Sequence, residues 1–293
     1  MKFKKSAGEI VFDITNYTIM LIMIIVTLYP CYYVLIASVS DPVRIYEGNG
    51  ILLFPKGFST NAYADVLSYK QLWTSYANTI FYVAVGGFLS VVVTIMSAFS
   101  LTRRDLPFKN LIMFAILFTM YFSGGLIPTY LVVKSIGILD SRLAIILPAL
   151  MSTYNLIITI SYFKGLPYEL EEAAKIDGAS DYTILLKIMI PLAKPIIAVI
   201  SLYYMVALWN EYFSAMIYLN KRSLYPLQLV LREILIQNDT ASMGSASNAG
   251  DVQSYAENLK YAVIVVSTIP ILCVYPYIQR FFVKGVTIGA VKG

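Results

Sequence analysis

The chain has 293 residues, of which 58% are hydrophobic and 13% are charged, and its mean hydropathy is +0.71. A soluble domain carries about 25% charged residues, so this composition predicts an integral membrane protein in contact with lipids. The net charge is +5, but the basic residues lie in short segments rather than in one patch, which argues against nucleic acid as a partner. There is no histidine, and both cysteines lie in apolar stretches, so we expect neither a metal site nor a disulfide.

Six stretches of the sequence are apolar and long enough to cross a membrane, which takes about 20 helical residues. The first follows three lysines, but its apolar run is about twice as long as the core of a signal peptide, so we expect a retained helix. We predict an all-α membrane protein in which residues 1–293 form one transmembrane domain. The six predicted spans cover about 14–37, 76–101, 111–133, 143–163, 196–219 and 261–282.

The positions of lysine and arginine predict the orientation of these helices, because cations are enriched in cytoplasmic loops. With six spans and a basic N-terminus inside, both termini and the segment 166–191 fall on the cytoplasmic side. The opposite side then receives fewer cations over longer loops. The basic groups assigned to the cytoplasm lie within residues 2–5, 103–109, 164–194 and 280–292.

The third span contains a predicted break. Gly124, Gly125 and Pro128 lie close together near its outer end, and such residues interrupt a helix. A broken helix frees backbone groups that must be satisfied in a cavity or against protein. A structural kink and a functional gate both explain this segment.

Residues 166–191 are polar and predict a short helix–turn–helix that lies across the membrane face. Glutamates follow Pro167, as is typical of the first turn of a helix, and Gly178 suits the left-handed position that ends one. We expect Asp181 to cap the second helix and Pro191 to end it. A plain amphipathic connector at the membrane interface is the alternative interpretation.

Polar and aromatic side chains within the spans are the candidates for a transport pathway, because polar groups are costly in a membrane. Aromatic rings stack on sugar faces, while amides and carboxylates bind hydroxyl groups, so this set suits a carbohydrate. Glu211 lies near the outer end of its helix, and it could instead reach the interface or bridge to another subunit. The candidates are Asn155, Tyr203, Tyr204, Trp209, Asn210 and Glu211.

Two further segments complete the chain. Within the predicted outer loop 220–259, residues 238–250 are small and polar, which indicates a segment that is mobile on its own. The C-terminal tail, 283–293, contains three glycines and is not expected to form a helix. There is no Gly-x-x-x-x-Gly-Lys-Ser/Thr phosphate loop, so we expect no ATPase activity in this chain.

The hairpin sequence Glu172-Ala173-Ala174-Lys175-Ile176-Asp177-Gly178-Ala179, with Ile188 and Pro191 further on, resembles the EAA loop of bacterial ATP-binding-cassette importers. Ile190 stands where leucine is usual. The tail resembles that of the smaller membrane subunit of the maltose importer and its carbohydrate-uptake relatives. The segment from Phe122 to Tyr130 resembles permeases for complex and uronate-containing oligosaccharides.

These resemblances imply a type I importer permease without an enzymatic activity or cofactor of its own, in the bacterial cytoplasmic membrane. Its implied partners are a homologous second permease subunit, two ATPase subunits that hold ATP and magnesium, and an extracytoplasmic solute-binding protein. The outer loop would reach into that binding protein. The residues implied to dock on an ATPase are Glu172, Ala173, Ala174, Asp177 and Gly178, and those of the tail are Lys284, Gly285, Gly289 and Lys292.

Two other functions remain open at this point. An importer of the same architecture could carry a different solute, such as a polyamine or phosphate. An ion-coupled secondary carrier would need buried ionisable residues at mid-membrane, and only Glu211 comes close.

Overall fold

The computed structural model describes residues 6–46, 51–244 and 258–273. Within these ranges the regular structure is helical, apart from one β-bridge between Ser40 and Phe58. The chain forms two compact units, one of residues 1–69 with 233–269 and one of residues 70–232 with 270–293.

Two continuous helices are long and apolar enough to cross a membrane, and they confirm the first two predicted spans. α1 (Ala7–Ser38) has 32 residues and a mean hydropathy of 2.4 in its most apolar part. Lys70–Thr102 has 33 residues and a corresponding hydropathy of 2.2; it consists of α4 (Lys70–Phe81), a π-helical segment (Tyr82–Gly86) and α5 (Gly87–Thr102). Ser6 and Glu9 begin α1 with a capping box.

In the first unit, the end of α1 is fixed by a buried amide. Asn258 begins the helix Asn258–Cys273, and its Nδ2 donates to the carbonyl oxygens of Ala37 and Ser40, each at 2.9 Å. Ser38 also bonds to Tyr63 on α3 (Asn61–Ser68), at 2.7 Å between hydroxyl oxygens. The two bonds from Asn258 reach carbonyl groups at and just beyond the end of the helix, where helical partners run out. A short helix, α2 (Pro42–Tyr46), follows α1.

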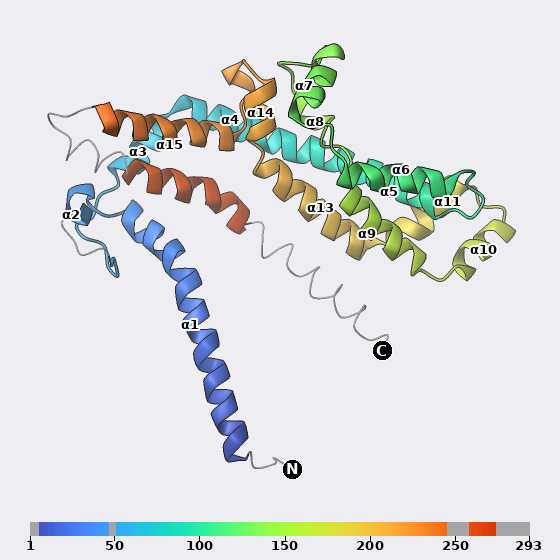
Figure 1. Ribbon diagram of the computed structural model, residues 1–293, viewed down its shortest axis with the longest axis horizontal. Helices are drawn as coiled ribbons and strands as arrows, with labels where there is room; N and C mark the ends of the chain where they lie inside the picture. Colours follow the sequence, from blue (N-terminus) through green and yellow to red (C-terminus); the bar gives the residue numbers. More distant parts are fainter. Residues whose placement is uncertain (1–5, 47–50, 245–257, 274–293) are drawn as a thin grey trace. The chain divides into compact units, whose positions relative to one another are not determined.

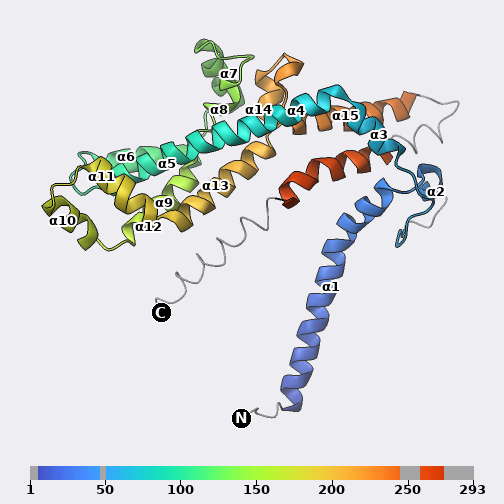
Figure 2. The same ribbon diagram turned by 180° about the vertical axis from the view of Figure 1, so that it is seen from behind.

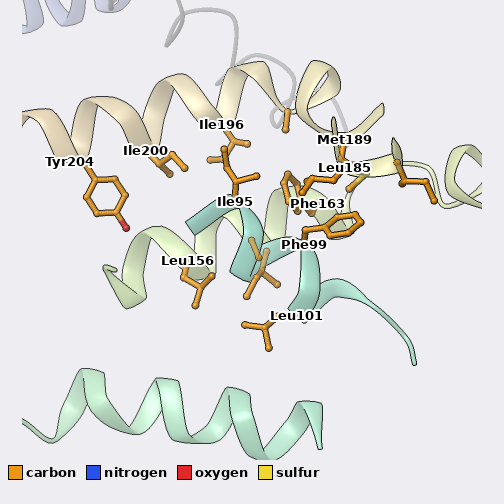
Figure 3. Close-up of a cluster of buried hydrophobic side chains, with 14 of the residues drawn as sticks. Ile95, Phe99, Leu101, Leu156, Phe163, Leu185, Met189, Ile196, Ile200 and Tyr204 are labelled. Atoms are coloured by element: carbon orange, nitrogen blue, oxygen red, sulfur yellow. The ribbon is translucent and has the colours of Figure 1, made fainter. Parts of the chain in front are cut away.

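In the second unit, α5, α9 (Thr153–Lys164) and α13 (Lys194–Trp209) pack together along their lengths (Figures 1 and 2). Figure 3 shows how apolar side chains from these three helices meet those of Leu185 and Met189, which precede α13. The hydroxyl groups of Thr94 and Tyr204 are also buried there and bond to each other. The labelled members of this core are Ile95, Phe99, Leu101, Leu156, Phe163, Leu185, Met189, Ile196, Ile200 and Tyr204.

The predicted break in the third span is confirmed. α6 (Lys109–Tyr121) and α7 (Leu126–Ser135) meet at an angle of 118°. Gly125 lies between them with a backbone φ of +86°, which residues with a Cβ atom rarely adopt. The two helices therefore form a bent pair rather than one straight span.

The predicted fourth and fifth spans are not continuous helices. α8 (Leu143–Ile146) ends before Pro148, which cannot donate a helical hydrogen bond, and α9 begins only after Ser152. α13 ends at Trp209, and a new helix, α14 (Phe213–Tyr218), follows. At that break the Oε1 of Glu211 accepts from the backbone N–H of Ser214 at 2.7 Å.

The region predicted as an outer loop begins with ordered structure. A 3₁₀ turn (Arg222–Leu224) leads into α15 (Leu227–Gly244). The start of this segment packs into the core, because leucines at the start of α15 bury their side chains and the N–H of Leu227 donates to Thr79 at 2.8 Å. The run predicted to be mobile begins only at residue 238. Residues 245–257, and with them part of the small polar run, lie outside the described residues, as does the tail 283–293.

A second polar contact fixes the corner between α7 and α8. Asp140 has φ of +55°, a conformation that aspartate and asparagine tolerate better than most residues. Its Oδ1 accepts from the backbone N–H groups of Asn220 at 3.0 Å and Lys221 at 2.9 Å. These hydrogen bonds lower the pKa of Asp140 from its ordinary value of 3.8.

We expect Asp140→Ala to lower the thermal unfolding midpoint more than Asp140→Asn, because the asparagine oxygen still accepts both backbone bonds. Because folding lowers the pKa of Asp140, its ionised carboxylate stabilises the folded chain at pH values above the ordinary pKa of 3.8. This contribution is lost as the pH falls through the lowered pKa. The advantage of the wild type over Asp140→Asn should therefore disappear on acidification. Thermal unfolding in detergent at several pH values measures both effects, and equal midpoints for the two variants would contradict the assignment.

Candidate functional site

The polar segment 166–191 forms the predicted helix–turn–helix. α10 (Glu169–Ile176) is followed by a turn, by α11 (Asp181–Ile184), and then by a π-helical segment (Leu185–Met189) and α12 (Ile190–Leu192). Gly178 has φ of +78° and ends α10, so the predicted left-handed cap is confirmed. The predicted cap of the second helix is wrong by one residue, since Ser180 accepts from the N–H of Thr183 and Asp181 is already helical.

An ion pair joins this hairpin to the end of α5. The guanidinium of Arg103 donates to the Oε1 of Glu171, and both side chains are about nine-tenths buried. Lys175 adds a contact of 3.2 Å to the same oxygen, and this hydrogen bond raises the pKa of Lys175. The carboxylate that holds the hairpin to the bundle is therefore Glu171.

Arg103 is itself held by its surroundings. Its guanidinium lies 4.0 Å from the ring centre of Phe99, and its Nε donates to the carbonyl of that residue at 3.3 Å. The ammonium of Lys109 donates to the carbonyls of Thr102 and Arg103, which satisfies the end of α5. Burial, with the nearby cations Lys164 and Arg103, lowers the pKa of Lys109.

The other face of the hairpin is exposed. Glu172, Ala173, Asp177 and Gly178, all predicted to dock on a partner, are exposed, whereas Ala174 is buried in the core of the bundle. The prediction that Ala174 lies on the contact surface is therefore wrong for this conformation. Three large apolar side chains of the hairpin are also exposed: Ile176 is 86% exposed, Tyr182 is 74% exposed and Leu186 is 61% exposed. We call this exposed set, with the four residues above, the docking face.

The structure brings four of the six pathway candidates together in one cavity of about 470 Å³, which we call the polar pocket. It lies between the start of α9 and the end of α13. In the part of the chain that the structure describes, no lysine or arginine lines it. Its lining residues are Ala149, Met151, Ser152, Tyr154, Asn155, Tyr203, Tyr204, Ala207, Leu208 and Glu211.

One tyrosine organises the pocket wall. The hydroxyl of Tyr204 bonds to Thr94 on α5 at 2.7 Å between oxygens, and it accepts from the backbone N–H of Ser152 at 3.0 Å. Ser90 donates to the carbonyl of Ala149 at 3.3 Å. Side chains of α5 and α13 thus satisfy backbone groups freed by the break between α8 and α9.

The remaining two candidates do not line the pocket. Trp209 is buried against Tyr76, with ring centres 6.5 Å apart, and its indole N–H has no hydrogen-bond partner among the described residues. Asn210 donates from Nδ2 to the carbonyl of Val206 at 2.8 Å, as a cap of α13. Their side chains therefore contribute to packing and to the end of the helix in this conformation.

Sequence reasoning missed Arg103 and Glu171. A signal for Glu171 was present, because residues three and four apart share a helix face, and Ala174 and Lys175 lie at those distances from it. The adjacent Glu172 necessarily points elsewhere. No comparable local signal marked Arg103, which is 68 residues away along the chain.

Residues 87–288 match the family described as binding-protein-dependent transport system inner membrane component, and the chain belongs to this family of permease subunits. It is therefore a component of the inner membrane and not an enzyme, since separate subunits hydrolyse ATP in such transporters.

The chain is similar over nearly its whole length to characterised relatives. It is 42% identical over 287 residues to the polygalacturonan/rhamnogalacturonan transport system permease protein YtcP of Bacillus subtilis, covering 96% of this chain and 98% of the relative. It is 40% identical to Protein LplC of the same species, covering 97% and 95%. It matches a chain in the crystal structure of a bacterial ABC transporter involved in the import of the acidic polysaccharide alginate, with a TM-score of 0.85, 33% identity, and 96% and 100% coverage. The predicted type I permease fold is confirmed.

We expect Arg103→Gln to destabilise the attachment of α10, because it leaves the Glu171 carboxylate buried without its main partner. Breaking a buried ion pair costs about 3 kcal/mol. Lys175→Gln, which removes the more exposed contact, should cost less than about 1 kcal/mol. Thermal unfolding and hydrogen exchange over residues 169–176 measure the difference, and equal effects of the two changes would contradict the assignment.

At the turn, Gly178→Ala should destabilise the hairpin by about 1 kcal/mol through its left-handed backbone alone, since no atom lies within 4 Å of the added Cβ. Gly178→Asn should cost less, because asparagine tolerates this conformation. Hydrogen exchange over residues 176–184 tests the order, and an alanine variant as protected as the wild type would refute it.

Proposed function

We propose that this chain is one of two membrane subunits of an ATP-binding-cassette importer for acidic oligosaccharides. It pairs with a homologous permease subunit, and two ATPase subunits supply ATP hydrolysis with their own ATP and magnesium. An extracytoplasmic binding protein delivers the sugar.

The relatives support the substrate class. The similar permease of Bacillus subtilis carries polygalacturonan and rhamnogalacturonan in its name, and the similar solved transporter imports alginate. Polygalacturonan, rhamnogalacturonan and alginate all contain carboxylate-bearing rings. The first two are named for the relative at 42% identity, and alginate for the solved transporter at 33% identity. The shared acidity of these substrates is the observation that carries the proposal.

The docking face supports the coupling. Ile176, Tyr182 and Leu186 are large apolar side chains exposed on a polar hairpin, and such patches are typical of protein interfaces. Glu172 and Asp177 lie beside them as charged contacts. ATP-driven closure of the ATPase pair would push this face and move α10, and the Arg103–Glu171 pair would pass the movement to α5.

The cations around the hairpin support its cytoplasmic orientation. Arg103, Arg104 and Lys164 line a small pocket of about 150 Å³ that Tyr168 and Glu171 of the hairpin also line. Arg104 lies 3.8 Å from the ring centre of Tyr168. This concentration of positive charge at one end of the bundle is typical of the cytoplasmic side. The proposal places both termini on that side too.

Two parts of the proposal rest on the resemblance. The tail residues Lys284, Gly285, Gly289 and Lys292 would contact the ATPases, and the segment 220–259 would meet the binding protein. Both lie wholly or partly outside the described residues.

Transport of a different solute is the main alternative. The family requires a binding protein, which argues against an ion-coupled secondary carrier, but its members need not share a substrate. Uptake of oligogalacturonides, neutral oligosaccharides, a polyamine and phosphate by cells with and without this chain separates the candidates. Uptake of only a polyamine or phosphate would overturn the sugar assignment.

We expect Glu172→Lys to reduce sugar uptake by more than about nine-tenths, because it replaces the anion that would contact the ATPase with a cation. The chain should remain in the membrane, since Glu172 is exposed and makes no core contact. Copurification of the ATPase and uptake are the measurements. Lys187→Glu, a charge reversal outside the docking face, is the matched control, and normal uptake by Glu172→Lys would refute the coupling role.

A further inference from the structure

Within the proposed function, the chemistry of the polar pocket points to one part of the substrate. We propose that the pocket binds the hydroxyl-bearing edge of a single pyranose ring, and that Glu211 keeps the carboxylate of that ring outside. The inference rests on the proposed sugar transport, but it concerns which edge of the sugar this subunit recognises.

The first observation is an unpaired amide. Asn155 lines the pocket and is 4% exposed, yet its side chain makes no hydrogen bond within the described part of the chain. Only its backbone groups are bonded, to Ser152 and Thr159. Within the described residues the buried side-chain polar atom that lacks a partner is Nε1 of Trp209, so the amide of Asn155 reaches the open space of the pocket, where a bound sugar hydroxyl group can take the place of water. An amide both donates and accepts, as does a sugar hydroxyl.

The second observation is a pair of rings beside this amide. Tyr154 and Tyr203 lie with ring centres 6.1 Å apart at 44°, and both are substantially exposed. Tyr204 is different, because its hydroxyl is already bonded to Thr94 and Ser152 and serves the wall. The two exposed rings provide an apolar surface for the face of a pyranose. The cavity volume is within the range of small-molecule sites.

The third observation is the sign of the charge. Among the described residues, Glu211 is the carboxylate that lines the pocket, and none of the lining residues is lysine or arginine. Its Oε1 is held by Ser214, so the carboxylate has a fixed place, while Oε2 makes no protein hydrogen bond in the described residues. A carboxylate accepts sugar hydroxyl groups well but repels a second carboxylate at short range. A uronate therefore fits only with its acid group pointing away.

The test measures direct binding to the purified complex of this chain with its partner subunits, by equilibrium dialysis with ATP under non-hydrolysing conditions. The probes are α-1,4-linked trigalacturonate and its uncharged methyl ester, which share every ring and hydroxyl group. Glu211→Gln keeps an oxygen for Ser214 and removes only the charge. It should tighten binding of the acid about five-fold relative to the ester.

Asn155→Leu should weaken binding of both probes about ten-fold, since the hydroxyl partner is lost. Asn110→Leu, at an exposed position of α6, is the matched control and should leave both affinities unchanged. If the wild-type complex binds the probes but Glu211→Gln leaves their affinity ratio unchanged, or Asn155→Leu has no effect, the pocket assignment is overturned and the sugar proposal stands. If an assembled wild-type complex binds neither probe, the proposed substrate class is overturned and the pocket assignment with it.

Discussion

The ion pair between Arg103 and Glu171 holds the hairpin 166–191 to the helical bundle, and the proposed coupling depends on it. It joins the last turn of α5 to α10, and the burial of both side chains protects it from solvent screening. Burying two charges is costly unless other bonds satisfy them, and here the ring of Phe99 and the ammonium of Lys175 share that task. Glu172, one residue on, lies on the other side of α10 and is exposed.

Helix breaks account for the polar pocket. Its lining comes from residues 149–155 at the break between α8 and α9, and from residues 203–211 leading to the break between α13 and α14. An unbroken helix would present only side chains to lipid or neighbours, whereas a break exposes backbone groups that need partners. Tyr204 and Ser90 supply those partners, while the side-chain amide of Asn155 forms no hydrogen bond within the described residues. The same irregularity that shortens the helices thus creates a site for polar groups.

The sequence predicted features that depend on local chemistry. The break at Gly125, the left-handed cap at Gly178 and the first two spans all follow from composition and from the conformational freedom of glycine. It failed where contacts between distant segments decide the outcome. Hydropathy could not show that Ser152 begins a new helix or that Ala174 faces inward, because burial against α5 is a tertiary property. Trp209 belonged to the strongest cluster of candidates and Asn155 was a weaker one, yet packing buries the ring of Trp209 and leaves the amide of Asn155 in the pocket.

The hairpin and the polar pocket are linked by α5 and α13. Arg103, directly after α5, binds Glu171 of the hairpin, and Thr94 lies about two and a half turns earlier on α5. α13 starts beside the hairpin core and carries Tyr204 to the pocket, and Glu211 follows its end. The Thr94–Tyr204 hydrogen bond ties these helices together at the pocket wall. Packed helices move as rigid elements rather than by stretching. A displacement of α10 that the ion pair passes to α5 must therefore either shift α13 with it or break that hydrogen bond, and in both cases the wall of the pocket changes.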